Sequence, residues 1–449
     1  MKKYTDSLGE IYVDDHNLWG ATTQRSLNNF KIGHYIMPKD VIYAIVTIKQ
    51  AAAQANFELG LISQEKYEAI ILACKQICGG QFDQHFPLSI FQTGSGTQTN
   101  MNVNEVIAHI ASIELHPNDD VNKSQSSNDV FPTAMHIAIY HNINKKLKPV
   151  IQQLIDQFKQ LELENQNIIK IGRTHLQDAV PMTFAQEFSG YRTSLENCLH
   201  YLEESSQHLL SLPLGATAVG TGINTVKGYK ELAVQNIAHI TNYPFICSNN
   251  LFQGLSMKDE VCMVHGSIKT LATTLFKIAN DIRYLASGPR CGYGEIEIPA
   301  NEPGSSIMPG KVNPTQCEAL SMVCTRVLGN DTTISFNASQ GQFELNTYMP
   351  VMVYTCLESI ELLADSIQSF ADHCVSGIKV LKNKNEENLS KSLMLATALN
   401  PHIGYDKASQ CAKYAHQHNL TLAEALEILL HIDQETSKEW LDPKNMIGE

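Results

Sequence analysis

The segment from Gly304 to Pro314 brings together residue types that can stabilise negative charge and move a proton. It reads Gly-Ser-Ser-Ile-Met-Pro-Gly-Lys-Val-Asn-Pro, and another proline precedes it. The glycines can take backbone angles that other residues avoid, and the prolines prevent a helix. Such a loop can direct backbone N–H groups, Lys311 and Asn313 toward an anion, with Ser305 beside them. A reaction through a negatively charged intermediate needs this arrangement; a polar surface loop is the alternative.

Three further polar segments, 93–102, 116–129 and 172–178, are dense in short hydroxyl and amide side chains. Each opens or precedes a helical pattern, and capping of helix N-termini is the usual role of such residues. The same groups, together with the N–H donors of a helix N-terminus, also make carboxylate sites. Because three such segments accompany the loop, the sequence favours an anion-binding site at a junction of helices.

Two single residues are candidates for proton transfer. His175 follows Arg173 and Thr174 in a polar turn, where an imidazole can be poised near neutral pH. A structural or merely exposed histidine is the alternative. Glu318 lies four residues after Pro314 on the helix expected there. Its carboxylate suits the positive end of the helix dipole, an interpretation slightly favoured over one in which it orients a histidine.

Composition limits the classes of function. The chain has 449 residues, of which 43% are hydrophobic and 18% charged, as in ordinary globular proteins of roughly two to four domains. A net charge of −13 argues against nucleic acid and anionic membranes as partners. No apolar run reaches the length of a membrane-spanning helix. An anionic substrate must therefore be attracted by a local positive patch.

The cysteines and the N-terminus indicate a reducing compartment. Eleven cysteines are scattered without a CxxC pair, and there is no HExxH string, so neither a zinc nor an iron–sulfur site is expected. The residues after Lys2 and Lys3 lack the apolar stretch of a secretory signal. We expect reduced, buried thiols and a cytoplasmic location.

Long helices are expected to position these polar segments. Apolar residues recur at alternating spacings of four and three from 257 to 285, a heptad pattern. Similar patterns run from 143 to 161 and from 353 to 370, and 184–210 also reads as helix. The sequence predicts a mainly all-α fold with an elongated central bundle of long helices. Other subunits would complete the bundle, and a monomeric long-helix scaffold is the alternative.

The expected organisation has three domains: an N-terminal domain at 1–126, a central helical bundle at 127–378 and a small helical C-terminal domain at 379–449. Shorter helices are predicted at 40–57, 63–77, 406–417 and 422–430. The Gly- and Pro-rich stretch 289–303 is expected to be a loop with one short strand, 295–298.

The four polar segments resemble those of class II fumarases, the iron-independent fumarate hydratases of the fumarase/aspartase superfamily. The likeness runs over nearly the whole chain, from Trp19-Gly20-Ala21 to the Leu-Asn-Pro-His-Ile-Gly-Tyr-Asp string at 399–406. The strings at 315–318 and 119–123 look like the fumarase versions. Related ammonia-lyases usually differ at 315–318 and have alanine at the position of Gly310. Argininosuccinate and adenylosuccinate lyases carry different residues around the lysine and asparagine of the loop.

The resemblance implies reversible hydration of fumarate to (S)-malate, a reaction of the tricarboxylic acid cycle. It implies Ser305 as the base, His175 as the acid/base that handles the leaving water, and Glu318 as the carboxylate paired with that histidine. Lys311 and Asn313 would stabilise an aci-carboxylate intermediate. The implied substrate-contacting positions are Ser95, Gly96, Thr97, Ser126, Ser127, Asn128, Thr174, Ser306 and Val312.

The resemblance also implies a homotetramer in which three subunits meet at each active site, and no metal or organic cofactor. One region departs from the pattern. Between Glu105 and His116 the chain lacks roughly ten residues, including a basic one. The following residues match a second carboxylate site of the family, whose ligand binding we expect to be weakened here: His116, Pro117, Asn118 and Asp119.

Two alternatives to the hydratase remain. An aspartate ammonia-lyase would release ammonia from L-aspartate, but the strings at 315–318 and 119–123 argue against it. A non-catalytic relative could keep the bundle as a structural or binding protein. The presence of Ser305, His175, Lys311 and Asn313 argues against that second alternative.

Overall fold

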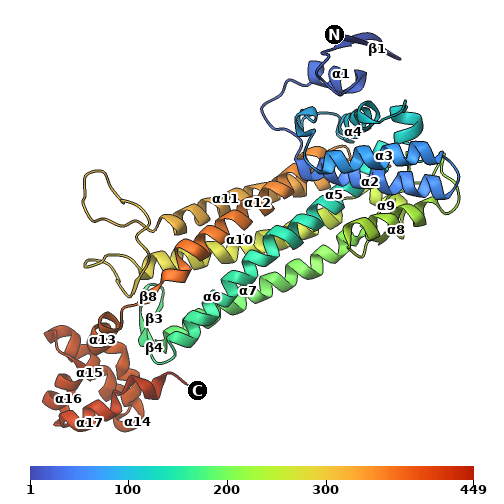
Figure 1. Ribbon diagram of the computed structural model, residues 1–449. Coiled ribbons are helices and arrows are strands. Elements are labelled where there is room, and N and C mark those ends of the chain that lie inside the picture. The colour runs from blue at the N-terminus through green and yellow to red at the C-terminus, as the bar shows by residue number, and fades with distance from the viewer. Residues whose placement is uncertain (449) are drawn as a thin grey trace. The chain divides into compact units, whose positions relative to one another are not determined.

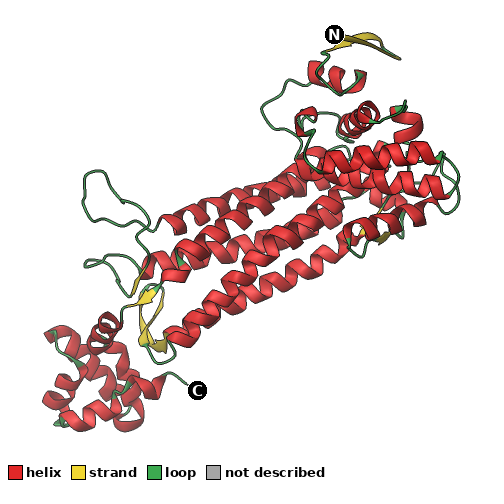
Figure 2. Cartoon of the chain, in the orientation of Figure 1, coloured by secondary structure: helices red, strands yellow, loops and turns green. Residues whose placement is uncertain are grey.

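The computed structural model describes residues 1–448, which form mostly helices together with four two-stranded sheets (Figure 2). The chain divides into two compact units, each built from three segments. The first unit comprises Met1–Pro149, Cys198–Thr273 and Cys324–Ala364. The second comprises Val150–Asn197, Thr274–Val323 and the chain from Asp365 onward.

The first unit holds most of the shorter N-terminal elements (Figure 1). Its elements are β1 (Lys2–Asp6), β2 (Gly9–Val13), α1 (Ala21–Asn29), α2 (Lys39–Glu58), α3 (Gln64–Cys78), α4 (Thr97–Ile110), α5 (Ser127–Asn142), β5 (Ser211–Leu212), α8 (Tyr229–Thr241), β6 (Ile246–Cys247) and α9 (Leu251–Ser256). Helix α2 is rich in alanine, the best helix former, and packs against α3, α5 and α8. Its buried Val41, Ile45 and Ile48 recur at helical spacing.

The second unit contains the β3–β4 hairpin and the C-terminal helices. Its elements are α6 (Lys148–Glu164), β3 (Ile169–Thr174), β4 (Gln177–Thr183), β7 (Ile296–Glu297), β8 (Lys379–Val380), α13 (Lys382–Lys391), α14 (Asn400–Ile403), α15 (Tyr405–His418), α16 (Leu422–Leu430) and α17 (Gln434–Trp440). Helix α6 begins in the first unit with Lys148 and Pro149. Four other long helices are also divided between the units: α7 (Phe184–Ser206), α10 (Asp259–Leu285), α11 (Thr315–Ala338) and α12 (Met349–His373).

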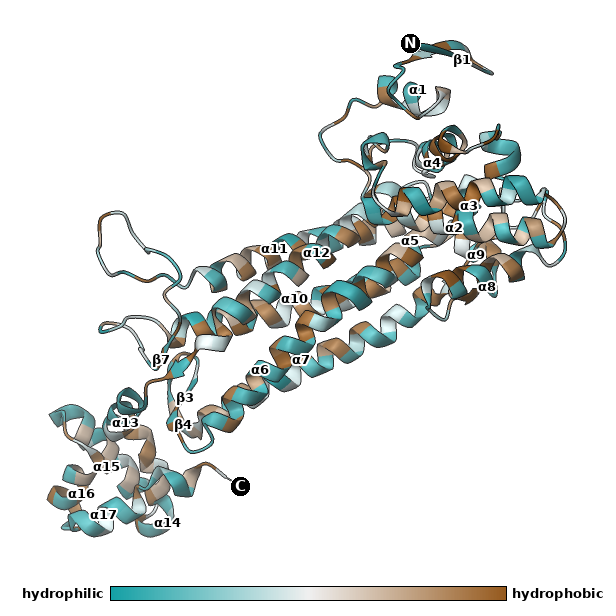
Figure 3. Cartoon of the chain, viewed as in Figure 1, coloured by the Kyte–Doolittle hydropathy of each residue, from teal (hydrophilic) through white to brown (hydrophobic). Residues whose placement is uncertain are grey.

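Amphipathic patterning accounts for the packing of the long helices. Figure 3 shows hydrophobic and hydrophilic residues on different sides of α6. Its buried residues Leu154, Phe158 and Leu161 follow the three- and four-residue spacing of one helical face. The ring of Phe158 lies 6.2 Å from that of Phe188 on α7. Aromatic contacts of this kind add to the stabilisation from burial.

A separate cluster of buried side chains holds the C-terminal helices together. Leu399, Cys411, Ala415 and Leu426 belong to it. Helix α16 begins with a capping box, in which the Thr421 side chain accepts from the backbone of the helix and Glu424 bonds back to the cap.

Most predicted helices are present, with several differences in detail. The heptad pattern from 257 corresponds to α10, but Met257 itself lies outside the helix and is exposed. The pattern from 143 to 161 is not one α-helix, because a π-helical turn, Ile143–Leu147, joins α5 to α6. The strand expected at 295–298 is shorter, Ile296–Glu297. The β1–β2 and β3–β4 hairpins were not predicted. The three-domain division stays a prediction.

Several absences hold for the described residues. No helix between residues 1 and 448 combines the length and the apolar composition that a bilayer crossing requires. No disulfide forms among the described cysteines, and most of their side chains are buried. No group of three His, Cys, Asp or Glu side chains in this part of the chain is arranged to hold a metal ion.

Candidate active site

The Gly304–Pro314 loop is closed by its own polar contacts. The N–H of Gly304 donates to the carbonyl of Lys311 at 2.9 Å, and Asn313 Nδ2 donates to the carbonyl of Gly304 at 2.7 Å. A side chain at position 304 would place its Cβ 2.5 Å from the Lys311 oxygen, so only glycine fits. Gly310 has a φ of +79°, which other residues rarely adopt. The glycines therefore fix the shape of the loop.

Ser305 sits in a setting that favours negative charge on its oxygen. Ser305 Oγ accepts hydrogen bonds from the N–H groups of Ile307 and Met308, each at 3.2 Å. Donors aimed at an oxygen favour its deprotonated form, as in an oxyanion hole. The serine is half-buried, while the loop around it is mostly exposed. The hydroxyl is thus accessible and already surrounded by backbone donors.

Lys311 supplies a cation next to this serine. Its ammonium donates to Asn313 Oδ1, so that the lysine and the asparagine form one polar pair. The loop and the preceding residues line a hollow of about 420 Å³ that includes Ser305, Lys311 and Val312. Ser306 is exposed on the same loop. An anion entering the hollow would meet positive charge and hydroxyl groups together.

His175 occupies the tip of the β3–β4 hairpin. Thr174 pairs with Gln177 across the hairpin, so His175 and Leu176 form a two-residue turn. Both have positive φ, +56° and +60°, as a type I′ turn demands. Thr174, His175 and Leu176 are exposed. The turn places the imidazole at the exposed end of the hairpin.

Glu318 lies in the first turn of α11, where its N–H donates to the carbonyl of Pro314. Its side chain is exposed. Within residues 1–448 no hydrogen bond or ion pair joins Glu318 to His175, and none joins His175 to Ser305. The pairing of these residues stays a prediction.

A second group of predicted residues lies in the first unit, at the N-termini of α4 and α5. Ser95 Oγ and Thr97 Oγ1 are 2.8 Å apart. Gly96 caps α4 with a φ of +74°, and a Cβ there would lie 2.1 Å from the ring of Phe131. Ser126 caps α5 in a capping box with Asp129. Both helices therefore present N–H donors beside hydroxyl side chains.

The structure joins these two helix N-termini through Asn100. Its Nδ2 donates to Ser127 Oγ at 2.9 Å and to Asn122 Oδ1 at 3.1 Å. Asn128 Nδ2 donates to the carbonyl of Ala218 at 2.8 Å. Capping therefore explains part of the polar run, as its residue types suggest, and the network brings the two predicted substrate-contacting segments together.

A buried lysine lies beneath this network. Lys49 Nζ donates to Asn122 Oδ1 at 2.8 Å and to Gln125 Oε1 at 3.0 Å. Burial lowers the pKa of Lys49 to about 7, with partial opposition from the charge of Asp129. Burial likewise raises the pKa of Asp129 to about 6. The network thus fixes the segment before α5 from the protein interior.

The segment with the second predicted anion site forms a short π-helical turn, Pro117–Val121. His116 Nδ1 accepts from the N–H of Asp119 at 3.1 Å. Lys66, on α3, lies 2.6 Å from Asp120 and supplies positive charge beside this turn. Asp120 engages that charge, so the prediction of weakened anion binding at His116 remains.

Comparison with known proteins covers the whole chain. A family model described as Lyase matches residues 9–329, and one described as fumarase C C-terminus matches residues 395–448. A class II fumarate hydratase from Staphylococcus haemolyticus is 53% identical over 451 residues, which is 98% of each protein. This chain belongs to the class II fumarate hydratase family.

Solved structures agree with this family assignment. The crystal structure of a recombinant class II fumarase from Schistosoma mansoni superposes with a TM-score of 0.96 at 42% identity, over 99% of this chain and 98% of that one. A fumarate lyase:delta crystallin from Brucella melitensis bound to cobalt gives 0.95 at 38% identity over the full length of both. The predicted mainly helical, fumarase/aspartase-like fold is confirmed.

Three charged residues that lie close to predicted site residues were not singled out from the sequence. They are Lys49 and Lys66, described above, and the buried Glu295, which contacts Arg173. The partners of Lys49 and Glu295 are far away in sequence, so no local motif marked either residue. An isolated charged residue inside an otherwise apolar helical pattern was the one available signal for Lys49.

Proposed function

We propose that this protein is a fumarate hydratase, which interconverts fumarate plus water with (S)-malate. The whole-chain relationship to class II fumarate hydratases supports the reaction. One observation supports the chemistry most strongly: two backbone N–H groups donate to Ser305 Oγ in a loop that also carries Lys311. A site for a dicarboxylate substrate fits this arrangement of donors and positive charge.

Removal of the C3 proton of malate is the difficult step. The resulting carbanion survives as an aci-carboxylate, which carries extra negative charge. We assign Ser305, as its alkoxide, to take this proton, because the N–H groups of Ile307 and Met308 stabilise charge on its oxygen. Lys311 and Asn313 are assigned to the developing charge on the carboxylate.

Departure of the C2 hydroxyl completes the elimination. The C–O bond breaks, the hydroxyl receives a proton and leaves as water, and the double bond of fumarate forms. We assign His175 to deliver that proton through a bound water, and Glu318 to orient and charge the histidine. In the hydration direction the same groups act in reverse.

Substrate carboxylates are assigned to the helix N-termini of the first unit and to the exposed residues of the loop. Ser95, Thr97, Ser126, Ser127 and Asn128 lie at the N-termini of α4 and α5, where the positive end of each helix dipole favours an anion. Thr174 and Ser306 are exposed next to His175 and Ser305.

We further propose that the enzyme is a homotetramer whose active sites combine segments of different subunits. Exposed apolar side chains on the long helices support this assembly, including Met263 and Phe276 on α10 and Phe336 on α11. The absence of a hydrogen bond or ion pair between His175 and Ser305 within the described residues is consistent with it. We also propose that the enzyme is cytoplasmic and uses neither a metal nor an organic cofactor.

The reaction is tested by ultraviolet absorbance of the purified protein with (S)-malate in the presence of a metal chelator. The proposal expects the absorbance of the conjugated fumarate double bond to rise at an unchanged rate with chelator. No rise with malate, together with release of ammonia from L-aspartate, would replace the hydratase with an ammonia-lyase. No reaction with either substrate would favour the non-catalytic alternative.

The assembly is tested by light scattering and by mixing two inactive variants. A mass four times that of the chain is expected. Subunits of Ser305→Ala and His175→Asn, dissociated together and reassembled, should recover part of the activity, because some sites would then combine intact residues from different chains. Recovery no greater than that of either variant reassembled alone would contradict shared active sites.

A further inference from the structure

A buried carboxylate of the second unit contacts strand β3, which leads into the turn that carries His175. Glu295 is completely buried, immediately before β7. Its N–H donates to the carbonyl of Leu285 at 2.9 Å, and its carbonyl accepts from the N–H of Leu381 at 2.9 Å and from Asn385 Nδ2 at 3.1 Å. The backbone of Glu295 is therefore held on both sides, between the end of α10 and the start of α13.

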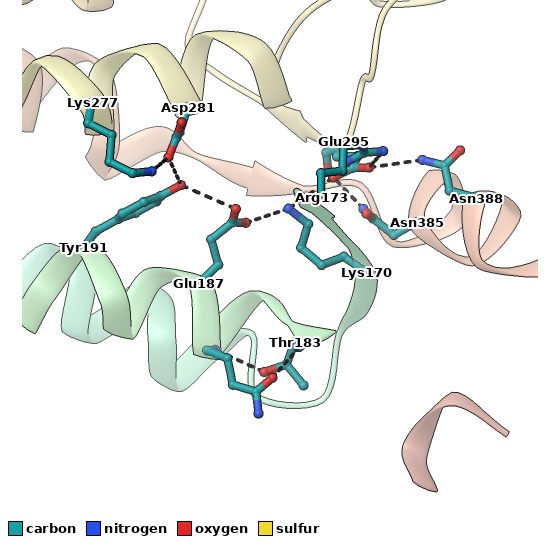
Figure 4. A network of polar contacts seen from close by, with 11 residues as sticks. Lys170, Arg173, Thr183, Glu187, Tyr191, Lys277, Asp281, Glu295, Asn385 and Asn388 are labelled. Carbon is teal, nitrogen blue, oxygen red and sulfur yellow. Dashed lines mark hydrogen bonds and ion pairs between the residues drawn. The ribbon is translucent and has the colours of Figure 1, made fainter. Parts of the chain in front are cut away.

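The side chain of Glu295 forms ion pairs with two residues of strand β3. Its Oε1 accepts from Arg173 Nη2 at 2.5 Å and from Asn388 Nδ2 at 3.3 Å, and its Oε2 lies 3.4 Å from Lys170 Nζ (Figure 4). Burial acts to lower the pKa of Arg173, but the hydrogen bond and charge of Glu295 outweigh it and raise that pKa. A carboxylate buried in this way is stable only with its cations beside it, because an unpaired buried charge is costly.

The same network extends away from Glu295 along α7 and α10. Lys170 Nζ also lies 2.7 Å from Glu187 on α7, whose carboxylate accepts from the hydroxyl of Tyr191 (Figure 4). The same hydroxyl lies 3.1 Å from a carboxylate oxygen of Asp281 on α10, so its single hydrogen is shared between the two carboxylates. Lys170 therefore keeps a close carboxylate partner without Glu295. Among the described residues Arg173 would be left with Asp178, at 4.0 Å, and the ring of Tyr293, 4.5 Å away.

The part of β3 that Glu295 holds leads directly into the strained turn. Arg173 is followed by Thr174, His175 and Leu176, and the last two have positive φ. Neither residue is a glycine, and leucine tolerates this conformation poorly. The hairpin is also irregular beneath the turn, with a register shift between Ile171 and Arg173. Strained conformations of this kind persist where surrounding contacts hold them.

We propose that Glu295 is a positioning residue for the hydration reaction, an inference that rests on the proposed function: through Arg173 it fixes the turn that carries His175. Glu295 does not touch substrate. Its backbone bonds to Leu285, Leu381 and Asn385 also fix the start of the segment that continues into the Ser305 loop. A carboxylate that served folding alone would affect stability and leave turnover per folded enzyme unchanged.

The first test replaces the charge and keeps the shape. Glu295→Gln should lower kcat for malate by about 10- to 100-fold, the cost of a small displacement of a reacting group, while KM changes little. The matched control is Glu297→Gln, the same change at an exposed position on the adjacent strand β7, which should leave kcat unchanged. Normal turnover of folded, fully assembled Glu295→Gln would overturn the proposal.

A double-mutant cycle tests the route through Arg173. Arg173→Gln leaves Glu295 with Lys170 and Asn388 as partners, so this variant should fold even if Glu295→Gln does not. Combining the two changes should lower kcat no further than the more damaging single change, because both break one contact. Multiplied losses would show that the two residues act independently, contrary to the proposal.

Hydrogen exchange separates this inference from the proposed function. Amides of residues 173–178 should exchange faster in Arg173→Gln, and in Glu295→Gln if it folds, than in the wild type or in Glu297→Gln, whether or not the protein hydrates fumarate. If the wild type is inactive but the variants show this exchange pattern, the proposed hydratase reaction is wrong and the role of Glu295 in fixing the turn stands. If the wild type is active but exchange is unchanged in both variants, the hydratase reaction stands and the role of Glu295 in fixing the turn is wrong.

Discussion

Ser305 and His175 obtain their settings from the backbone next to them. The N–H groups that bond to Ser305 Oγ come from two and three residues further along the chain. The imidazole of His175 projects from a two-residue turn. Because neighbouring residues determine this local geometry, short sequence motifs were enough to identify both residues as candidates.

Replacement of His175 by asparagine tests its role without breaking the turn. Asparagine tolerates positive φ better than most residues, so the turn should survive in His175→Asn. Loss of the acid/base group should lower kcat by about 100-fold or more, the usual contribution of such catalysis. Steady-state kinetics with malate, alongside the exposed His208→Asn as control, measures this effect. Comparable turnover in both variants would remove His175 from the mechanism.

Contacts between charged residues and partners far away in the sequence could not be predicted. Arg173 and Glu295 are 122 positions apart in the chain, and Lys49 lies 73 positions from Asn122. Sequence periodicity reports which face of an element is buried, but it does not report which charge meets which. These contacts exist only once the tertiary fold has formed.

Loop shape and helix N-termini position the chemistry at the level of elements. A Cβ at position 304 would overlap the Lys311 carbonyl, so Gly304→Ala should open the loop and misplace the donors to Ser305. We expect kcat to fall roughly 100-fold, the cost of losing an aligned oxyanion donor. Gly329→Ala is the control, because its Cβ would meet nothing within 4 Å on α11. Kinetics and thermal melts of both variants decide the outcome; full activity in Gly304→Ala would contradict the assigned loop geometry.

The buried Lys49 supports the segment that leads into α5, and its replacement gives a second prediction at the level of elements. Lys49→Met keeps the volume but removes the donors to Asn122 and Gln125. We expect a folded variant, since an apolar side chain avoids the cost of burying a charge. Its KM for malate should rise roughly tenfold, equivalent to losing about one hydrogen bond, with a smaller change in kcat. The exposed Lys75→Met should behave like the wild type. An equal response of the two variants would refute a role for Lys49 in substrate binding.

Helices and hairpins differed in how well the sequence predicted them. The long apolar repeats identified α10, α12 and most of α6 because helical periodicity accumulates over many residues. The β3–β4 hairpin was read only as a polar turn, since its strands are short and its register shifts between Ile171 and Arg173. The strand at 295–298 was expected, yet its partner β8 lies far along the chain. Strand pairing of this kind leaves little trace in local sequence.

Histidines shielded from water contribute to the acid sensitivity of the whole molecule. Burial lowers the pKa of His85, His109, His136 and His265. When the pH falls below the ordinary histidine range, the unfolded chain therefore binds protons more readily than the folded chain, and stability decreases. The raised pKa of Asp129, about 6, opposes this trend, but it is a single group.

We accordingly expect a lower melting temperature at about pH 5.5 than at about pH 7.5, measured at one protein concentration. Calorimetry or circular dichroism over this range provides the measurement. A melting temperature that is constant or rises toward acid would mean that the buried histidines take up protons in the folded state.

The most direct measurement of the central claim follows fumarate in D₂O by proton NMR, with the wild type and Ser305→Ala side by side. The wild type should form malate that carries one deuterium at C3, since hydration adds one solvent-derived hydrogen there. The Ser305→Ala variant, assembled normally, should form this product at least about 100-fold more slowly. Unchanged fumarate with the wild type would contradict the hydratase, and equal rates for the two proteins would contradict the assignment of Ser305 as the base.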